Sequence, residues 1–474
     1  MTSAATLTAS LSTSLSTSPD APLAGAPVAV IPAHHLMTFL LQLGLLLGLA
    51  TLLGRLSARF GLPALLGELC AGILIGPSLL ANAAPDLFAW LLPQDPARFH
   101  LIDAVGQLGV LLLVGMTGMH LDTGFLRRQG RSAAWISGTG LLVPLAFGVG
   151  IGFLAPPEMI AGGTDPMVFA LFLGVALCVS AIPVIAKILT EMRLLHRDIG
   201  QLILSTSVID DVAGWFLLSV VSALATAGAR TGQAALTAIA LLAVFVLASL
   251  LIGRRVVAAV LRLADRGQGD RTLIAAVTVL FLLFAAVTHA LGFEAILGAF
   301  VCGALIGSSP DLKVARLAPL QTFVAAVLAP IFFATAGLRM DLTELANPVV
   351  LGAGLLVLAV AIAGKFAGAY LGARIARRTR WEALALGAGL NSRGVIEVIV
   401  AMVGLRLGVL TTASYTVIVL VAVVTSMMAP PLLRFAASRI APTEDEVVRE
   451  EFFDALETPG QTPDKQFVTT AKEA

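Results

Sequence analysis

Apolar residues along this chain fall into long runs that are separated by short polar segments. Each run is about 18–25 residues long, which is the length that an α-helix needs to cross the hydrocarbon core of a bilayer. A transmembrane β-barrel would instead require short segments of alternating apolar and polar residues, and such segments do not occur in the sequence. The pattern therefore predicts an all-α polytopic membrane protein.

The runs predict about thirteen transmembrane helices. They lie at Leu36–Gly54, Leu62–Leu80, Ile102–Met119, Ala133–Leu154, Pro166–Leu189, Ile199–Ala225, Ala234–Ile252, Thr272–Leu291, Ala295–Ile306, Thr322–Gly337, Val349–Gly372, Leu384–Val403 and Thr411–Leu433. Hydropathy alone defines the boundary near Gly292 poorly. The basic loops before Thr272 and after Ile306 are expected on the same side, so an even number of crossings must separate them.

Lysine and arginine are distributed unevenly among the loops. Loops after odd-numbered spans hold clusters such as those around Arg127, Arg254 and Arg377, whereas loops after even-numbered spans hold single arginines. By the positive-inside rule, the N-terminus is outside and the C-terminus is in the cytoplasm.

The composition agrees with a membrane protein and adds little else. The chain is 58% hydrophobic and 12% charged, with a formal net charge of +1. A soluble chain would carry about twice that share of charge, and a net charge near zero gives no reason to expect nucleic-acid binding. Residues 1–35 read as a disordered extracytoplasmic leader, and residues 434–474 read as a short cytoplasmic tail without a nucleotide-binding fingerprint. No cofactor is expected.

Two segments in the first half of the chain resemble two in the second half. "GELCAGILIGPSLL" (Gly67–Leu80) resembles "GAFVCGALIGSSPDL" (Gly298–Leu312), and "GMHLD" (Gly118–Asp122) resembles "GLRMD" (Gly337–Asp341). These pairs lie seven spans apart. Since seven is odd, the matching segments cross the membrane in opposite directions, which is the inverted-topology repeat of many secondary transporters.

Under this offset the fifth and twelfth spans correspond, and both carry helix-breaking residues. "CVSAIPVIAK" places Val179 and Ser180 before Pro183, which cannot donate a hydrogen bond to the carbonyl of Val179. "GLNSRGVIEV" places Asn391, Ser392 and Gly394 at bilayer depth. Backbone groups freed there are tolerated only against protein or a wet cavity, so we expect two discontinuous helices at the transport site. Two ordinary helix kinks are the alternative.

The sixth span carries adjacent aspartates, Asp210 and Asp211, and the eleventh carries Lys365. A charged side chain at the bilayer centre costs about 2.5–3.5 kcal/mol, so each of these groups needs a partner. Consecutive helical residues diverge by about 100°, so only one aspartate can face Lys365. The other is expected to face the cavity between the broken helices, where a proton and a metal cation compete for it.

Three rival functions use some of the same residues. An intramembrane aspartyl protease needs two carboxylates that face each other, which adjacent residues on one helix do not. A channel would pass cations without depending on a proton gradient. A transporter of organic solutes is disfavoured by a small polar site without aromatic residues. An enzyme is therefore not expected.

The motifs together resemble the monovalent cation/proton antiporter-2 family. The resemblance covers roughly Leu36–Leu433 and includes "SAIPVIAKILTE", "VIDDVAGW", "IFFATAGLRMDL" and "LNSRGVIEVIV" in the family's order. It implies exchange of Na⁺ or Li⁺, or of K⁺, for protons by an elevator mechanism. A K⁺/H⁺ antiporter or K⁺ efflux pathway of the same fold is the alternative. It also implies a homodimer, with the bacterial inner (plasma) membrane as the expected location.

The resemblance assigns parts of the transmembrane domain, residues 36–433, to two roles. Helices in residues 36–120 and 272–338 would form the dimerisation part, and helices in residues 133–226 and 349–433 the moving core. Asp211 would carry the cation and the proton, and Asp210 would pair with Lys365. In the family, members with two adjacent aspartates exchange two protons for one cation and so move net charge. The resemblance implies the same electrogenic exchange here.

The sequence departs from the family at one acidic position. Some relatives place a glutamate four residues before the aspartate pair, where it meets the arginine of the second broken helix; this chain has Thr206 there. Arg393 therefore needs another partner, and Glu397, four residues further along the same helix, is a candidate. Glu294 lies at a helix end, where it is expected to reach water.

Overall fold

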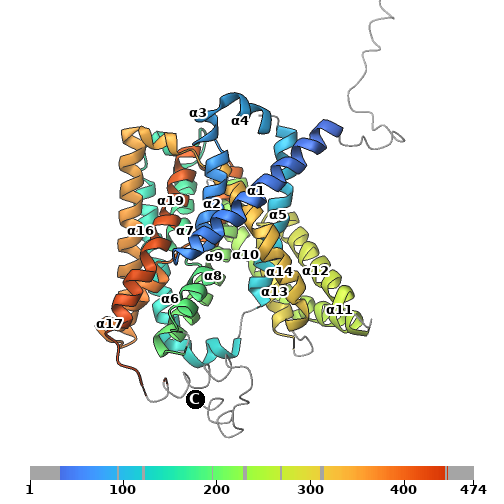
Figure 1. Cartoon of the computed structure of the whole chain (residues 1–474). Coiled ribbons are helices and arrows are strands. Elements are labelled where there is room, and N and C mark those ends of the chain that lie inside the picture. Colours follow the sequence, from blue (N-terminus) through green and yellow to red (C-terminus); the bar gives the residue numbers. More distant parts are fainter. Residues whose placement is uncertain are drawn as a thin grey trace, which may run out of the picture.

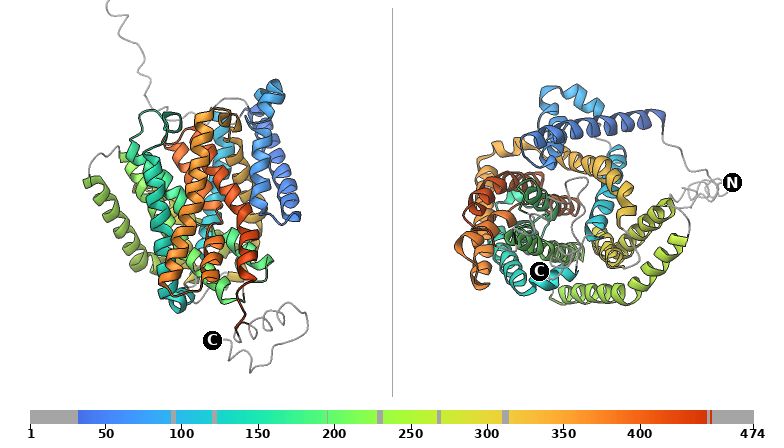
Figure 2. Two further views of the ribbon diagram at one scale, coloured as in Figure 1. Left: turned by 90° about the vertical axis from the view of Figure 1, so that its left-hand side faces the viewer. Right: turned by 60° about the horizontal axis from the view of Figure 1, so that its bottom comes forward.

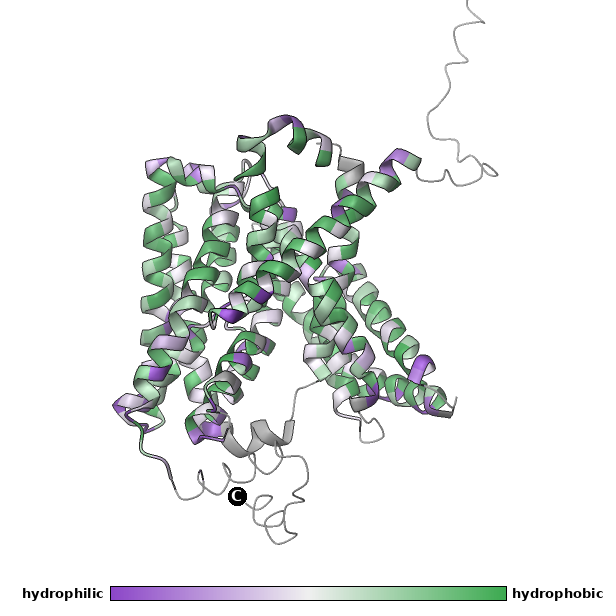
Figure 3. Ribbon diagram, in the orientation of Figure 1, coloured by the Kyte–Doolittle hydropathy of each residue, from purple (hydrophilic) through white to green (hydrophobic). Residues whose placement is uncertain are grey.

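The computed structural model describes residues 32–92, 96–119, 123–194, 196–227, 232–266, 270–309, 314–443 and 446. Most of the predicted leader, residues 1–31, and most of the tail, residues 447–474, lie outside the described residues. Within them the fold is all-helical, as the apolar runs predict (Figure 1). Apolar residues cover the length of most helices and polar residues gather toward their ends (Figure 3).

Nineteen α-helices occur in the described part of the chain. They are α1 (Ala33–Arg59), α2 (Ala64–Ile75), α3 (Leu80–Ala83), α4 (Pro85–Leu91), α5 (Pro96–Met119), α6 (Thr123–Gly152), α7 (Pro166–Cys178), α8 (Ile182–Glu191), α9 (Asp198–Ala227), α10 (Gly232–Ala248), α11 (Arg254–Arg266), α12 (Asp270–Ala290), α13 (Ala295–Gly307), α14 (Ala318–Phe323), α15 (Ala329–Leu338), α16 (Pro348–Ile375), α17 (Arg380–Leu390), α18 (Val395–Arg406) and α19 (Thr412–Ala437).

Each of the thirteen predicted spans coincides with a helix or with an interrupted helix. Of the described helices, ten segments are long and apolar enough to cross a membrane, and the bent pair α17–α18 makes an eleventh. The fifth span begins with α7 and the ninth is α13, and these helices have only 13 residues each. An all-helical membrane fold is confirmed, and the full count of thirteen crossings stays a prediction.

The helices pack in two groups that lie side by side (Figure 2, right). In one group α6 packs against α7 and α16, and α17 packs against α16 and α19. In the other, α2 packs against α1 and α15, and α13 packs against α5 and α12. The α9 helix lies near the boundary between the two groups, in contact with α7, α17 and α13. The assignment of a dimerisation part and a moving core stays a prediction.

Glycines of the matching repeat segments occupy equivalent positions in the second group. A Cβ atom added to Gly72 would lie 1.9 Å from the carbonyl oxygen of Ala334 in α15. A Cβ atom added to Gly303 would likewise lie 1.9 Å from the carbonyl oxygen of Gly115 in α5. Both distances are far below van der Waals contact, so each helix pair meets backbone to backbone at a glycine.

A second pair of equivalent glycines extends the match. A Cβ atom at Gly67 would lie 2.1 Å from the carbonyl oxygen of Leu53 in α1, and one at Gly298 would lie 2.1 Å from that of Phe284 in α12. In both halves of the chain, two glycines at matching positions let a helix, α2 or α13, contact the backbones of two neighbouring helices. This shared contact accounts for the sequence similarity between α2 and α13.

Gly72→Val and Gly303→Val should each destabilise the protein, because the added side chain must push two helix backbones apart. Overpacking of this kind costs about 1–3 kcal/mol or more. The midpoint of thermal unfolding in detergent should therefore fall in both variants. Gly352→Val is the matched control, since Gly352 lies in α16 with no atom within 4 Å of its added Cβ. Equal midpoints in all three variants would contradict the backbone approach.

Candidate functional site

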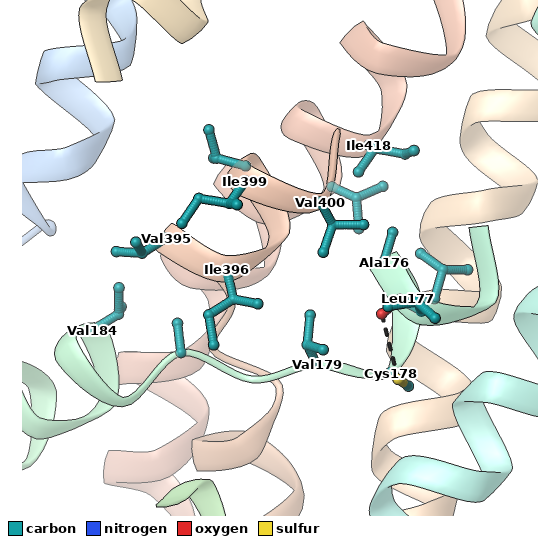
Figure 4. Packing of buried hydrophobic residues seen from close by; sticks show 14 of the residues in the cluster. Ala176, Leu177, Cys178, Val179, Val184, Val395, Ile396, Ile399, Val400 and Ile418 are labelled. Atoms are coloured by element: carbon teal, nitrogen blue, oxygen red, sulfur yellow. Dashed lines mark hydrogen bonds between the residues drawn. The ribbon is translucent and has the colours of Figure 1, made fainter. Parts of the chain in front are cut away.

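The site is built where two broken helices cross. The first break separates α7 from α8 by the extended residues Val179, Ser180 and Ala181, and the second separates α17 from α18, which are bent by 45°. Ala181 N–H donates to the carbonyl oxygen of Ser392 at 3.3 Å, which joins the two breaks. Ser180 Oγ lies 3.0 Å from the carbonyl oxygen of Leu390. The extended segment after Cys178 passes directly beside α18 (Figure 4).

Pro183 lies at the start of the second half-helix, after the break. It lies in the first turn of α8, where a helix has no intrahelical partner for the N–H that proline lacks. The interruption is therefore an extended segment of three residues before Pro183, and Val179 lies in this segment, outside both half-helices. Proline here favours the start of the second half-helix.

Gly394 allows the two breaks to approach. A Cβ atom added to Gly394 would lie 2.7 Å from Cγ2 of Val184 in α8 and 3.1 Å from Cδ2 of Leu65 in α2. Any larger residue would therefore separate the second break from the first half of α8.

Two buried cations bind the carbonyl oxygens at the C-terminal end of α7. Lys365 Nζ donates to the carbonyl oxygen of Cys178 at 2.7 Å. Arg393 donates to those of Ala176 and Leu177 at 2.9 and 2.6 Å. A helix C-terminus carries partial negative charge and leaves its last carbonyls without intrahelical partners. The lysine and the arginine, both fully buried, satisfy both needs.

Arg393 is also paired with Glu397, the candidate partner. Arg393 Nη1 lies 3.4 Å from Glu397 Oε1, and both side chains are fully buried. The hydroxyl of Ser426 donates to the Arg393 carbonyl, which ties α19 to the second break. Thr206 takes no part in this ion pair, since its hydroxyl donates to the carbonyl of Leu202 at 2.8 Å. The α7 carbonyls were not foreseen as partners of Arg393.

Asp210 has hydrogen-bond partners on both of its carboxylate oxygens. Lys365 Nζ lies 2.8 Å from Oδ2 of Asp210, and Ser180 Oγ donates to the same oxygen at 2.8 Å. Ser137 Oγ of α6 donates to Oδ1 at 2.6 Å. Lys365 also donates to the carbonyl of Gly140 at 3.1 Å. Ser137 was missed by sequence reasoning, because a single serine in an apolar run gives no signal of its partner.

Asp211, the next residue, differs from Asp210 because one of its carboxylate oxygens is unpaired. Its side chain is 1% exposed, and its Oδ1 atom has no hydrogen-bond partner among the described residues. The backbone N–H of Ile182, at the start of α8, interacts with its carboxyl group. Protein therefore encloses Asp211 in this conformation, and the expectation that it faces a cavity between the broken helices stays a prediction.

The second break also holds buried polar atoms without a hydrogen-bond partner among the described residues. They include both amide atoms of Asn391 and the hydroxyl of Ser392. The Ser392 carbonyl accepts a hydrogen bond from Ala181, and the N–H of the next residue, Ile182, interacts with Asp211, so the backbone of the second break and Asp211 both meet the start of α8. Buried polar groups are normally hydrogen-bonded, and unpaired ones mark places where an ion or water binds. No group of three or more His, Cys, Asp or Glu residues suited to a multivalent metal occurs within the described ranges.

Glu294 does not reach water as expected. It is 6% exposed and lies 2.5 Å, Oε2 to Nη2, from Arg406. Since Glu294 precedes α13 and Arg406 ends α18, this ion pair joins the two groups of helices on the face where α9 ends. No local sequence signal indicates this pairing, because the two residues are 112 positions apart.

Comparison with known proteins identifies the arrangement. The model of the family described as sodium/hydrogen exchanger, transmembrane, matches residues 46–438. The chain is 31% identical over 404 residues to the Na⁺/H⁺ antiporter NhaS4 of Synechocystis sp., with 84% of this chain and 97% of that protein covered. It is 28% identical to the Na⁺/H⁺-K⁺ antiporter GerN of Bacillus cereus, with 84% and 96% covered.

Plant relatives and a solved structure complete the comparison. The chain is 30% identical to cation/H⁺ antiporter 17 of Arabidopsis thaliana, but spans only 48% of that protein. The fold matches the sodium proton antiporter MjNhaP1 of Methanocaldococcus jannaschii with a TM-score of 0.67 at 16% identity, covering 85% of this chain and 99% of that one. The matched transmembrane region and the shared fold place this chain in the sodium/hydrogen exchanger family, a family of cation/proton antiporters.

Proposed function

We propose that this chain exchanges a monovalent cation for protons, and that the two compete for the carboxylate of Asp211. The observation that carries the proposal is the contrast between adjacent residues. Both carboxylate oxygens of Asp210 are paired, with Lys365, Ser180 and Ser137, whereas Asp211 keeps an unpaired oxygen in the same buried region. Leaving a carboxylate oxygen unpaired in the protein interior is costly unless a proton or a cation occupies it.

Asp211, Asn391 and Ser392 supply the oxygen ligands that a hard monovalent cation prefers. A carboxylate, an amide carbonyl and a hydroxyl replace part of the hydration shell of Na⁺, Li⁺ or K⁺ without the charge needed for a divalent ion. We favour Na⁺ and Li⁺ as substrates. A K⁺/H⁺ antiporter or K⁺ efflux pathway is the second candidate, supported by the relative named as a Na⁺/H⁺-K⁺ antiporter.

Exchange requires that the site open to each side in turn. The division into two helix groups supports an elevator movement, in which α6–α9 and α16–α19 move against α1, α2, α5 and α12–α15. We further propose that the chain forms a homodimer through the second group. It would lie in a bacterial plasma membrane with its arginine-rich loops in the cytoplasm.

Asp211→Asn should abolish cation-dependent proton movement, because an amide binds neither a proton nor a cation as a carboxylate does. Proteoliposomes with an internal pH dye report the exchange when Na⁺, Li⁺ or K⁺ is added outside. Asp86→Asn, on the exposed surface of α4, is the control and should retain wild-type rates. The order of the ions decides between the two candidate substrates. Equal responses of Asp211→Asn and wild type would refute the role of Asp211.

Acidification should raise the KM for the cation without lowering the maximal rate, because a proton on Asp211 must leave before a cation binds. Where the proton occupies the site, one competing proton raises KM about tenfold per pH unit, and two raise it more steeply. Initial rates at several cation concentrations between acid and neutral pH give the slope. A KM that is independent of pH, with a rate that falls instead, would indicate that protons inhibit elsewhere.

Lys365→Met should destabilise the protein strongly, because it leaves the buried Asp210 carboxylate without its counter-charge. Breaking a buried ion pair typically costs about 3–5 kcal/mol. The double variant Lys365→Met/Asp210→Asn should recover part of that loss, since it removes both charges. Thermal unfolding of wild type, both single variants and the double variant measures the coupling. Additive effects of the two substitutions would mean that the pair contributes no coupling energy.

A further inference from the structure

The C-terminal half of α9 carries three buried polar side chains that the proposed site does not use. They are Trp215, Ser219 and Ser222, which are at most 2% exposed. Neither Trp215 Nε1 nor the hydroxyls of Ser219 and Ser222 have a hydrogen-bond partner among the described residues. Three unpaired polar groups in one stretch of helix are unusual in a protein interior, where such groups are nearly always satisfied.

The spacing places these groups in line with Asp211. Asp211, Trp215, Ser219 and Ser222 follow one another at intervals of four, four and three residues within the single helix α9. Residues at these intervals share one face of an α-helix. The unpaired polar atoms therefore form a stripe that starts at the unpaired oxygen of Asp211 and runs about 16 Å along the helix.

The serines in the stripe differ from other hydroxyl residues of the same helix. Ser205, Thr206 and Ser207 each donate to the carbonyl four residues earlier at 2.8 Å. That bond is the usual way for a serine or threonine in an apolar helix to satisfy its hydroxyl. Ser219 and Ser222 do not make it. Their hydroxyls therefore stay available to another partner.

The stripe faces the boundary between the two helix groups. The ring of Trp215 packs against that of Phe300 in α13, with centroids 6.1 Å apart. Gly214, which points to another side of α9, instead lies against Val179 of the first break, since its added Cβ would lie 2.7 Å from Val179 Cγ1. A movement of α9 relative to α13 would consequently uncover the stripe and leave the crossing of the broken helices intact.

A cavity of about 480 Å³ lies at the far end of the stripe. Leu224 and Ala225 of α9 line it, less than one turn beyond Ser222. The loops before α7 and after α18 complete it, including Asp165 and Gly408. At roughly 30 Å³ per water molecule, a volume of this size accommodates a hydrated monovalent cation.

We infer that Trp215, Ser219 and Ser222 line the route by which cations and protons reach Asp211 from the face at which α9 ends. The inference rests on the proposed function and deepens it by naming the access path. In this conformation the route is closed by the packing of Trp215 on Phe300 and by the nearby ion pair between Glu294 and Arg406. When α9 moves away from α13, water enters and pairs with the polar groups of the stripe.

Labelling of introduced cysteines tests the route directly. The native cysteines at 70, 178 and 302 are first replaced, and then Ser219→Cys or Ser222→Cys is introduced. A membrane-impermeant, positively charged methanethiosulfonate is added to proteoliposomes on the side of the cavity, and labelling is read by mass. Ala225→Cys in the cavity is the positive control. Val221→Cys, equally buried on another face of α9, is the negative control.

The stripe cysteines should react at least about tenfold faster than Val221→Cys, because only their face of α9 becomes accessible in part of the population. Labelling rates at both stripe positions that match Val221→Cys, while Ala225→Cys reacts, would overturn the inference. The readout by mass does not require transport. A failure of the access route is therefore distinguishable from a failure of Asp211 to carry the exchange.

Removing the hydroxyls separates an access role from a structural one. Ser219→Ala/Ser222→Ala should slow exchange several-fold while leaving the unfolding midpoint unchanged or raised, because replacing an unpaired buried hydroxyl loses no hydrogen bond. A lowered midpoint with unchanged exchange would instead show that the serines serve packing, and would also overturn the inference.

Discussion

The structure depends on neutralising polar backbone where no water reaches it. Interrupting α7 leaves carbonyl oxygens at bilayer depth, and such groups are costly in hydrocarbon. Lys365 and Arg393 approach from other helices and bind those of Ala176, Leu177 and Cys178. These cations in turn need the counter-charges of Asp210 and Glu397. The crossing of the broken helices is thus stabilised by one connected network of charges and dipoles.

That network explains how adjacent aspartates can take different roles. Successive residues on a helix diverge by about 100°, so the first aspartate can join Lys365 while the second points elsewhere. Ser180 and Ser137 complete the shell of Asp210. Asp211 is left with an unpaired oxygen, and Asn391 and Ser392 of the second break also carry unpaired polar atoms. An unpaired carboxylate oxygen in the protein interior is costly, and the proposed binding of a proton or a cation there would remove that cost.

The sequence predicted the all-helical fold and the position of both breaks, because run length and clustered helix-breaking residues are local signals. It also indicated the repeat, which the equivalent approaches of Gly72 and Gly303 explain. Partners distant in the chain could not be predicted. Arg393 binds the end of α7 and Glu294 binds Arg406 only because of how the helices pack. The geometry of the first break was also unforeseen, since Pro183 belongs to the helix after it.

Direct competition between cation and proton at one carboxylate is the central claim. Isothermal titration of the purified protein with Na⁺ in two buffers of different ionisation enthalpy measures the number of protons released per cation bound. Near the pH at which half of the sites are protonated, the account predicts a fractional release that approaches one proton per cation as the pH falls. Asp211→Asn should bind no Na⁺ and release no protons. Binding of Na⁺ to the wild-type protein without any proton release, at every pH tested, would contradict the account.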